Sequence, residues 1–238
     1  MENHSVPVAR PTEALSPSLA ADGDAYEVKF RLTAQEAEAA ETWARKRLTP
    51  DPYGANGVYC TTSLYLDTPF LDIYHKTPGY RRSKYRLRRY GSQEWVHLER
   101  KTRRGDRVRK RRDRIALADV PLLLDGGGGV WFGPRIRQRL LRPVCWISYT
   151  RTAFLSVAPG GTVRLTLDRD VMGATASGWT VPDRVDGRPL LPGEAILELK
   201  FRASLPVLFH ELLAVLPSRL AGVSKYGRCV EAWELAGR

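Results

Sequence analysis

One stretch of the chain, residues 81–114, constrains the fold more than any other. It contains sixteen of the 38 lysines and arginines but only four of the 26 aspartates and glutamates, so it carries +12, the formal charge of the whole protein. Apolar residues alternate with these charges, as where Tyr85 and Leu87 flank Arg86. Because the side chains of a β-strand alternate between its two faces, this alternation of apolar and charged residues indicates strands with one basic face. The stretch therefore predicts a basic β-ribbon that holds a polyanion, and not a solvated tail.

The rest of the chain is balanced in charge, with 22 basic and 22 acidic residues. A length of 238 residues and a hydrophobic fraction of 43% allow a sizeable core, and all-β barrels and sandwiches of this length are commonly one domain. We expect residues 1–24, rich in Ala, Pro and Ser, to form a disordered leader and residues 25–238 to form a single domain. No apolar run reaches the roughly 18–20 residues of a membrane span. Cys60, Cys145 and Cys229 form no CxxC pair, which favours a reduced, cytoplasmic setting over a disulfide framework or a thiolate zinc site.

Hydrophobic periodicity and turn residues predict a chain dominated by strands. The predicted strands cover residues 26–32, 57–67, 80–90, 93–103, 106–117, 144–157, 162–171, 179–181 (a weak strand) and 194–202. The predicted helices or helical turns cover residues 33–48, 68–75, 118–124, 134–142, 206–216 and 224–238. Thr33 and Glu36 form a capping box at the start of the first helix, and the glycines of residues 125–129 indicate a flexible linker. Roughly seven to nine largely antiparallel strands with covering helices indicate an α+β fold.

At least five of these strands have a charged face. The charged faces contain Glu27, Lys29 and Arg31; Arg82, Lys84, Arg86 and Arg88; His97, Glu99 and Lys101; Arg164, Thr166 and Asp168; and Glu198 and Lys200. One interpretation is an ordinary amphipathic sheet with one wet face. The other is a ligand site, because like charges on neighbouring strands repel by roughly 0.2–1 kcal/mol per close pair and a polyanion would relieve that repulsion. If the sheet closes, the charged face lines a pore and the apolar face contacts the helices outside.

Eight short motifs occur in order between residues 25 and 235. They are Glu27-x-Lys29, Ser63-Leu-Tyr-Leu-Asp67, Lys84-x-Arg86-x-Arg88-x-Tyr90, Glu99-x-Lys101, Tyr149-x-Arg151, Arg164-x-x-x-Asp168, Glu198-x-Lys200 and Ser224-Lys225-Tyr226. Together they resemble the VTC domain of polyphosphate polymerases, in the triphosphate tunnel metalloenzyme (CYTH-like) superfamily. The resemblance implies a closed antiparallel β-barrel, the triphosphate tunnel, with helices packed on the outside. It also implies a metal-dependent phosphotransferase that moves the γ-phosphate of ATP to a growing polyphosphate chain and releases ADP.

Site residues follow from the same resemblance. Those implied for phosphate binding are Lys29, Lys84, Arg86, Arg88, Lys101, Lys110, Tyr149, Arg151, Arg164, Lys200, Ser224 and Lys225. Those among them that are expected to act in catalysis are Lys200, Arg86, Arg88 and Lys225. Glu198 would hold the metal, Mn²⁺ or Mg²⁺, with Glu99 and Glu27 as further candidates, since hard cations prefer oxygen ligands. Glu99 is alternatively a salt-bridge partner of a tunnel arginine.

Two other functions stay open on the sequence. Tripolyphosphate or a nucleoside triphosphate could be hydrolysed in the same tunnel, although the first strand has Glu27 and no second glutamate of the ExExK type, which favours the polymerase branch. A non-catalytic module that binds polyphosphate or nucleic acid is the other function. A nucleic-acid reader needs exposed stacking aromatics, for which Tyr85, Tyr90 and Trp95 are candidates, although Tyr85 falls on the apolar face. The resemblance implies ATP and inorganic polyphosphate as ligands, and we do not expect nucleic acid. A membrane-protein partner, which would place the chain at the inner face of a membrane, stays open.

Strand parity separates the charges of residues 81–114 into classes. Those whose parity should place them inside the tunnel are Lys84, Arg86, Arg88 and Lys101. Arg89 and Arg100, of the opposite parity, should lie outside. The basic cluster expected at a tunnel mouth comprises Arg103, Arg104, Arg107, Arg109, Lys110, Arg111 and Arg112. Ser63 and Asp67 are expected to fix the end of their strand and the turn that follows.

Overall fold

Eight antiparallel strands close into a barrel in the computed structural model, which describes residues 25–105, 107–124, 131–216, 219–220 and 222–237. Around the ring the strands are β7 (Arg142–Ala158), β3 (Val58–Asp67), β4 (Ser83–Tyr90), β5 (Trp95–Arg104), β6 (Arg107–Ala116), β1 (Ala25–Thr33), β10 (Glu194–Phe201) and β8 (Gly161–Thr175). Pairing of β8 with β7 closes the ring. The two-residue strands that extend the sheet are β2 (Thr49–Pro50), β9 (Arg188–Pro189) and β11 (Arg219–Leu220). The predicted closed barrel is confirmed, whereas the predicted leader (1–24) and linker (125–129) lie outside the described residues.

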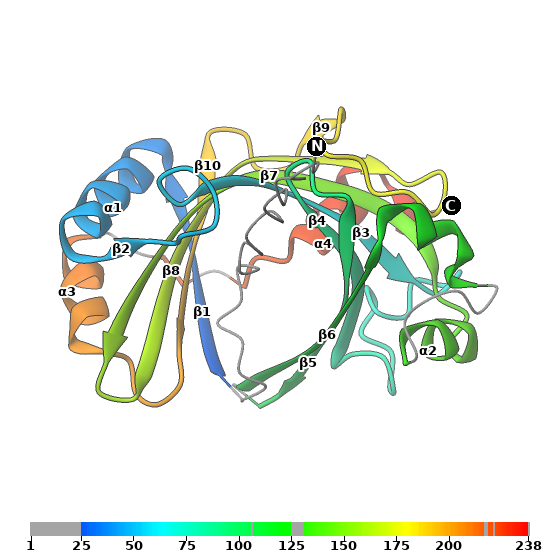
Figure 1. Cartoon of the computed structure of the whole chain (residues 1–238), viewed down its shortest axis with the longest axis horizontal. Helices are drawn as coiled ribbons and strands as arrows, with labels where there is room; N and C mark the ends of the chain where they lie inside the picture. The colour runs from blue at the N-terminus through cyan, green and yellow to red at the C-terminus, as the bar shows by residue number, and fades with distance from the viewer. Residues whose placement is uncertain (1–24, 106, 125–130, 217–218, 221, 238) are drawn as a thin grey trace, which may run out of the picture.

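The two walls of the barrel meet at junctions of unequal length. Figure 1 looks into the barrel, with β1, β8 and β10 in one wall and β3 to β6 in the opposite wall. On one side β7 joins the walls, pairing with β3 over ten residues and with β8 over thirteen. Among the described residues, β1 pairs with β6 through two, Ala25 with Val108 and Tyr26 with Arg107. Within the described part of the chain, the seam between β1 and β6 is therefore the shorter of the two junctions.

Helices cover the apolar outer face of this barrel, as predicted. α1 (Ala34–Arg47) and α3 (Val207–Val215) pack on the wall of β1, β8 and β10 (Figure 1). The capping box is present at α1: the Glu36 amide donates to Thr33 Oγ1 at 3.3 Å, and the Thr33 amide donates to Glu36 Oε2 at 2.7 Å. The segments that pack elsewhere are the 3₁₀ helix η1 (Leu117–Leu123), α2 (Phe132–Gln138), α4 (Lys225–Ala232) and the 3₁₀ helix η2 (Leu235–Gly237). In the part of the chain that the structure describes, no helix has the length and apolarity needed to cross a bilayer.

Alternation along β4 shows how the sequence orients the sheet. Tyr85 and Leu87 are buried in the outer core, where the Tyr85 ring lies 6.2 Å from that of Phe132 in α2. Arg86 and Arg88 therefore project to the other side of the strand, into the barrel. Because the apolar face of β4 is buried in the outer core, its charged face lies in the barrel interior.

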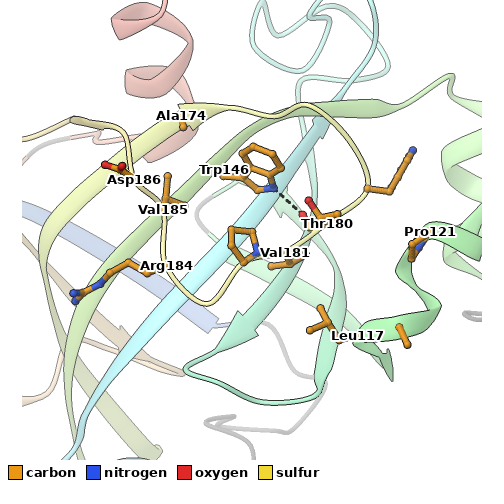
Figure 2. Close-up of a pocket in the computed structure, with 12 residues that line it drawn as sticks. Leu117, Pro121, Trp146, Ala174, Thr180, Val181, Arg184, Val185 and Asp186 are labelled. Carbon is orange, nitrogen blue, oxygen red and sulfur yellow. Dashed lines mark hydrogen bonds between the residues drawn. The ribbon is translucent and has the colours of Figure 1, made fainter.

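The predicted strand at residues 179–181 is wrong. These residues belong to a loop on the outer face of the barrel, which Figure 2 shows beside Trp146. Trp146 Nε1 donates to the Thr180 carbonyl at 2.7 Å, and Arg89 Nη1 donates to the Val181 carbonyl at 3.4 Å. β9, further along the chain, takes the strand position beside β8. Side-chain donors thus satisfy carbonyls that the local alternation assigned to a strand ladder.

Two predicted helices have different bounds in the structure. α2 begins at Phe132 and ends at Gln138, whereas the prediction covers residues 134–142. Leu140 has a left-handed backbone (φ 52°), and β7 already begins at Arg142. α4 ends at Ala232 and does not continue as an α-helix to the C-terminus. Long-range pairing and backbone reversal set these ends, and neither is visible in the local pattern.

Candidate active site

Charged side chains from three neighbouring strands form rows inside the barrel. In register across β4, β5 and β6, these rows are Lys84–Lys101–Lys110, Arg86–Glu99–Arg112 and Arg88–His97–Arg114. Lys101 reaches Glu27 of β1, and Lys84 reaches Ser224 before α4, so both point inward. Arg89 has the opposite parity and donates to carbonyls on the outer side. The structure therefore orients these side chains as their parity predicts.

Glu99 is surrounded by three cations, and the four side chains form what we call the Glu99 cluster. Glu99 is 1% exposed; it accepts from Arg86 Nε and from Arg112 Nη2, each at 2.7 Å. Lys110 Nζ lies 2.5 Å from its Oε1. Burial opposes ionisation, but the charges of the three cations outweigh it and hold the pKa of Glu99 well below its ordinary value. Both oxygens have cationic partners, so the geometry favours the salt-bridge role of Glu99 over the metal-ligand role.

Two carboxylates, on β1 and β10, converge on one lysine. Lys29 Nζ lies 3.1 Å from Glu27 Oε1 and 3.3 Å from Glu198 Oε2. Lys101 Nζ donates to both oxygens of Glu27, at 2.5 and 2.7 Å. Burial and the charge of Glu198 raise the pKa of Glu27, but Lys101 and Lys29 outweigh them and lower it to about 2. The interior thus holds two ionised carboxylates that face one point.

These two carboxylates are the part of the site that suits a divalent metal. Among the described residues there is no group of three or more His, Cys, Asp or Glu side chains that could hold a metal ion. Mg²⁺ and ions like it are usually held by one or two carboxylates together with the phosphates of a substrate. Glu27 and Glu198 fit that smaller donor set, in which phosphate oxygens and waters would supply the remaining ligands.

A third group centres on Asp168, which is fully buried. Arg151 Nε and Nη2 donate to its two oxygens at 2.6 and 2.8 Å, and Lys225 Nζ donates to Oδ2 at 2.6 Å. Burial raises the pKa of Asp168, but Arg151 and Lys225 lower it to about 2. Lys225 Nζ also lies 4.5 Å from the centre of the Tyr149 ring. The structure therefore brings three predicted site residues together around a carboxylate to which the sequence assigns no role.

Asp67 fixes both the turn after β3 and the start of α4. It accepts hydrogen bonds from three backbone amides of the following turn at 2.7–2.9 Å and from the Tyr226 hydroxyl at 2.6 Å. This agrees with the predicted role of Asp67 and also positions Lys225, the neighbour of Tyr226. The same role predicted for Ser63 is wrong. Ser63 lies in the middle of β3 and accepts from Arg88 Nε at 3.1 Å, because its parity turns it into the barrel.

Three interior cations, Lys84, Arg88 and Lys200, form no ion pair with any described carboxylate, and we call them the carboxylate-free cations. Lys84 Nζ donates to Ser224 Oγ at 2.8 Å, and Arg88 is 4% exposed beneath the Tyr90 ring. Burial, together with the charges of other interior lysines, lowers the pKa of Lys84 to about 8, and burial also lowers the pKa of Lys200. Buried cations without counterions attract an anionic ligand.

The predicted tunnel-mouth position is wrong for Arg112 and for Lys110, whose Nζ contacts Glu99 in the interior. The sequence assigns Arg112 to a tunnel mouth, but in the structure it lies inside, where its Nη2 also donates to the Tyr90 hydroxyl at 2.9 Å. It shares strand parity with Lys110 and Arg114, and this alternation is the signal that could have placed it.

Two further interior residues, Asp51 and Tyr59, carry no such signal in the sequence. Arg164, a predicted phosphate ligand, donates through Nη2 to Asp51 Oδ2 and to the Tyr59 hydroxyl, each at 2.7 Å. Asp51 lies in the loop after β2, and Tyr59 belongs to β3. Both lie outside the motifs, and they meet Arg164 only because the barrel closes.

A hollow on the outer face of the barrel is separate from this site. It encloses about 520 Å³, and its mainly apolar walls include Leu117, Pro121, Trp146, Val181 and Val185 (Figure 2). Arg184 and Asp186 lie in the same lining. Such walls lack the convergent cations that phosphate groups require.

The closed antiparallel barrel with its cationic interior defines a protein of the triphosphate tunnel class. Within that class, the family model described as the VTC domain matches residues 24–234, and the chain belongs to this family. No curated protein sequence matches the chain.

Solved structures resemble the barrel at low sequence identity. A predicted adenylate cyclase of Bacillus halodurans is 11% identical with a TM-score of 0.53, over 85% of this chain and 94% of that one. HpAC1 of Hippeastrum, a predicted adenylyl cyclase with a dominant triphosphatase activity, is 14% identical with a TM-score of 0.49, over 88% and 96%. PH1819 of Pyrococcus horikoshii OT3 is 15% identical with a TM-score of 0.48, over 87% and 99%. The first of these likenesses supports the fold.

Proposed function

We propose that this chain is an ATP-dependent polyphosphate polymerase, which transfers the γ-phosphate of ATP to a growing polyphosphate chain and releases ADP. The observation that carries the proposal is the charge inside the barrel, where, apart from the exposed Arg114 and the Arg31–Glu194 ion pair, eleven described cations face five carboxylates. The cations are Lys29, Lys84, Arg86, Arg88, Lys101, Lys110, Arg112, Arg151, Arg164, Lys200 and Lys225. The carboxylates are Glu27, Asp51, Glu99, Asp168 and Glu198. Membership of the VTC-domain family supports phosphate chains as the ligand that supplies the missing negative charge.

The chemistry of phosphoryl transfer suits this interior. A terminal oxygen of the acceptor chain attacks the γ-phosphorus, and the bond from that phosphorus to the bridging oxygen breaks, so that ADP leaves with the electron pair. The attacking oxygen is already ionised, and catalysis therefore depends on in-line positioning and on cancelling charge at the equatorial oxygens. Arg88 offers a planar fork to those oxygens, and Arg86 adds positive charge beside it although Glu99 holds its Nε and Nη2. Lys200 and Lys225 offer point charges.

A metal ion would add to this charge cancellation. Glu198, with Glu27 as the second carboxylate, would hold Mn²⁺ or Mg²⁺, which would neutralise phosphate oxygens when bound. Lys29 already contacts both carboxylates and keeps them ionised and close together. Glu99 does not join this set, because the Glu99 cluster occupies its oxygens.

Pairing of the carboxylates favours transfer over hydrolysis. A hydrolase needs a group that positions or deprotonates the attacking water. Each of the five interior carboxylates contacts at least one lysine or arginine, so none of them is placed to act as that base. A phosphate oxygen requires no such activation.

Incubation of the protein with ATP and Mn²⁺ tests the proposal. We expect long phosphate polymer and ADP in amounts that match the phosphate incorporated. Free phosphate without polymer would indicate a hydrolase instead. An intact protein that binds polyphosphate but converts no ATP, with Mn²⁺ or with Mg²⁺, would indicate a binding module.

A further inference from the structure

A basic pocket lies beside the barrel interior, and apart from Lys84 and Ser224 its lining residues have no part in the reaction proposed above. It encloses about 710 Å³ and is formed by β1, the loop between β3 and β4, and the start of α4. Its five cations are Arg31, Lys76, Arg81, Lys84 and Arg228, and Glu231 is the one carboxylate among its lining residues. The pocket is therefore strongly cationic in its own right.

Lys84 belongs both to this pocket and to the interior. It pairs with Lys101 across β4 and β5, in the row that continues to Lys110. Its Nζ donates to Ser224 Oγ, and Ser224 caps α4 at the pocket wall. The positive end of the α4 dipole adds to the field there. A cationic surface thus continues from the phosphate rows into the pocket.

Two cations of the pocket have no counterion among the described residues. Arg31 is paired with Glu194, and Arg228 lies 3.6 Å from Glu231. Lys76 and Arg81 are exposed, and neither forms an ion pair with a described residue. Exposed, unpaired cations at the edge of a basic site are suited to a flexible polyanion.

The aromatic residues of the pocket are already packed. The Tyr74 ring lies edge-on against His75 and Tyr226, with centroids 5.0 and 6.4 Å apart. Tyr226 in turn stacks on Tyr65 at 5.4 Å. Tyr226 is 3% exposed and stacked on Tyr65, so its ring offers no face to a nucleobase, and Tyr74 is held by its two neighbouring rings. This packing argues against a site for the nucleoside of ATP.

We infer that this pocket is a second anion subsite, which binds the polyphosphate chain beyond the phosphates that react in the interior. The inference rests on the proposed function and adds to it the path that the polyphosphate chain takes outside the interior. A chain held at both places is a bivalent ligand, since its second contact forms at a high effective concentration. Affinity should therefore depend on chain length, and a ligand as short as tripolyphosphate should gain little from the pocket.

Paired substitutions separate the pocket from the interior. The pocket variant is Lys76→Gln/Arg81→Gln. The matched control is Lys46→Gln/Arg184→Gln, which removes two exposed charges, from α1 and from the outer loop, that form no described ion pair. Binding of tripolyphosphate, long-chain polyphosphate and ATP would be measured by calorimetry for the wild type and both variants.

We expect the wild type to bind the long chain more tightly than tripolyphosphate. The pocket variant should bind the long chain roughly tenfold more weakly, since two partly screened charges are removed, but tripolyphosphate less than about twofold more weakly. The dependence of long-chain affinity on salt should also become shallower, by roughly 0.7 in log–log slope for each phosphate that is no longer neutralised. The control should follow the wild type with all three ligands.

The binding measurements distinguish a failure of the subsite inference from a failure of the proposed function. If the wild type binds neither polyphosphate, the proposed function fails. If the wild type prefers the long chain and the pocket variant keeps that preference, the subsite is overturned and the function stands. A pocket variant that weakens ATP binding alone would also overturn the subsite and assign the pocket to the nucleoside.

Discussion

The Glu99 cluster and the carboxylate-free cations lie in the same barrel but differ in how their charge is compensated. In the Glu99 cluster, three cations lie within 2.7 Å of one carboxylate that is 1% exposed. Lys84, Arg88 and Lys200 have no described carboxylate within ion-pair distance. The first arrangement completes itself within the folded chain, whereas the second requires a ligand to complete it.

The residue that β5 contributes to each row accounts for this difference in charge compensation. Across β5 the three rows place Lys101, Glu99 and His97 between basic neighbours on β4 and β6. The glutamate converts its row into a buried ion-pair network, whose partners become costly to remove. Lysine and histidine leave the flanking rows cationic. Glu99 therefore compensates the middle row from within it, whereas in the neighbouring row Lys101 pairs with Glu27, Lys110 pairs with Glu99, and Lys84 is left without a described carboxylate.

The largest expected effect follows from breaking the compensated row. Glu99→Gln should lower the free energy of unfolding by about 3–5 kcal/mol at pH 7, because three buried cations lose their counterion. Since the folded pKa of Glu99 lies well below its ordinary 4.5, this contribution is complete above pH 4.5 and is lost as the pH falls through the folded pKa. Urea unfolding at several pH values measures the difference from the wild type.

Glu94→Gln is the matched control for this substitution. Glu94 is on the same ribbon, but its side chain is 83% exposed and lies 3.7 Å from Arg89. Its removal should cost less than about 0.5 kcal/mol. A similarly small effect of Glu99→Gln would contradict the structural role of the Glu99 cluster.

The next effect concerns activity and should leave stability nearly unchanged. Arg88→Met and Lys200→Met should each lower the rate of polymer synthesis by about 100- to 1,000-fold, the usual cost of removing one group that stabilises the transition state. Neither should destabilise the protein by more than about 1 kcal/mol, because each removes a buried charge that lacks a carboxylate. Rates of polymer formation and urea midpoints would be measured on the same samples.

Arg100→Met provides the comparison on the outer face. Arg100 has the opposite parity in β5 and donates to Thr102 Oγ1 at 3.2 Å. It should retain nearly full activity. If Arg88→Met and Lys200→Met were as active as Arg100→Met, the assignment of the interior to phosphate transfer would be wrong.

Strand parity explains how much of this site the sequence could predict. Because a period of two fixes which side chains share a face, the inward positions of Lys84, Arg86 and Arg88 follow from the apolar residues between them. The same rule places Arg112 inside. It is hard to apply there, because residues 103–112 are so basic that the alternation is hidden.

Contacts between distant segments explain what the sequence could not predict. Asp51 meets Arg164 across 113 residues of chain, and Thr180 meets Trp146 across a loop that has no strand partner of its own. Such contacts depend on how the ring closes, and local alternation contains no information about closure. The salt-bridge role of Glu99 stayed ambiguous for the same reason, since a carboxylate on an inward face suits a metal and a cation equally well.

The smallest expected effect tests whether a carboxylate-free cation costs stability. Burial and the interior lysines lower the pKa of Lys84 from 10.5 to about 8, so the folded state disfavours its charged form. Lys84→Met should therefore stabilise the unliganded protein by about 1–3 kcal/mol at pH 7. The cost of the wild-type lysine is complete below pH 8 and disappears as the pH rises from 8 to 10.5, where the unfolded chain holds a proton that the folded chain has released. Urea unfolding at pH 7, 9 and 10 should show the advantage of Lys84→Met shrinking over this range, with Lys46→Met on the exposed face of α1 as the control. An advantage that stayed constant with pH would mean that Lys84 is not held as a strained cation, and its place among the ligand-requiring charges would be lost.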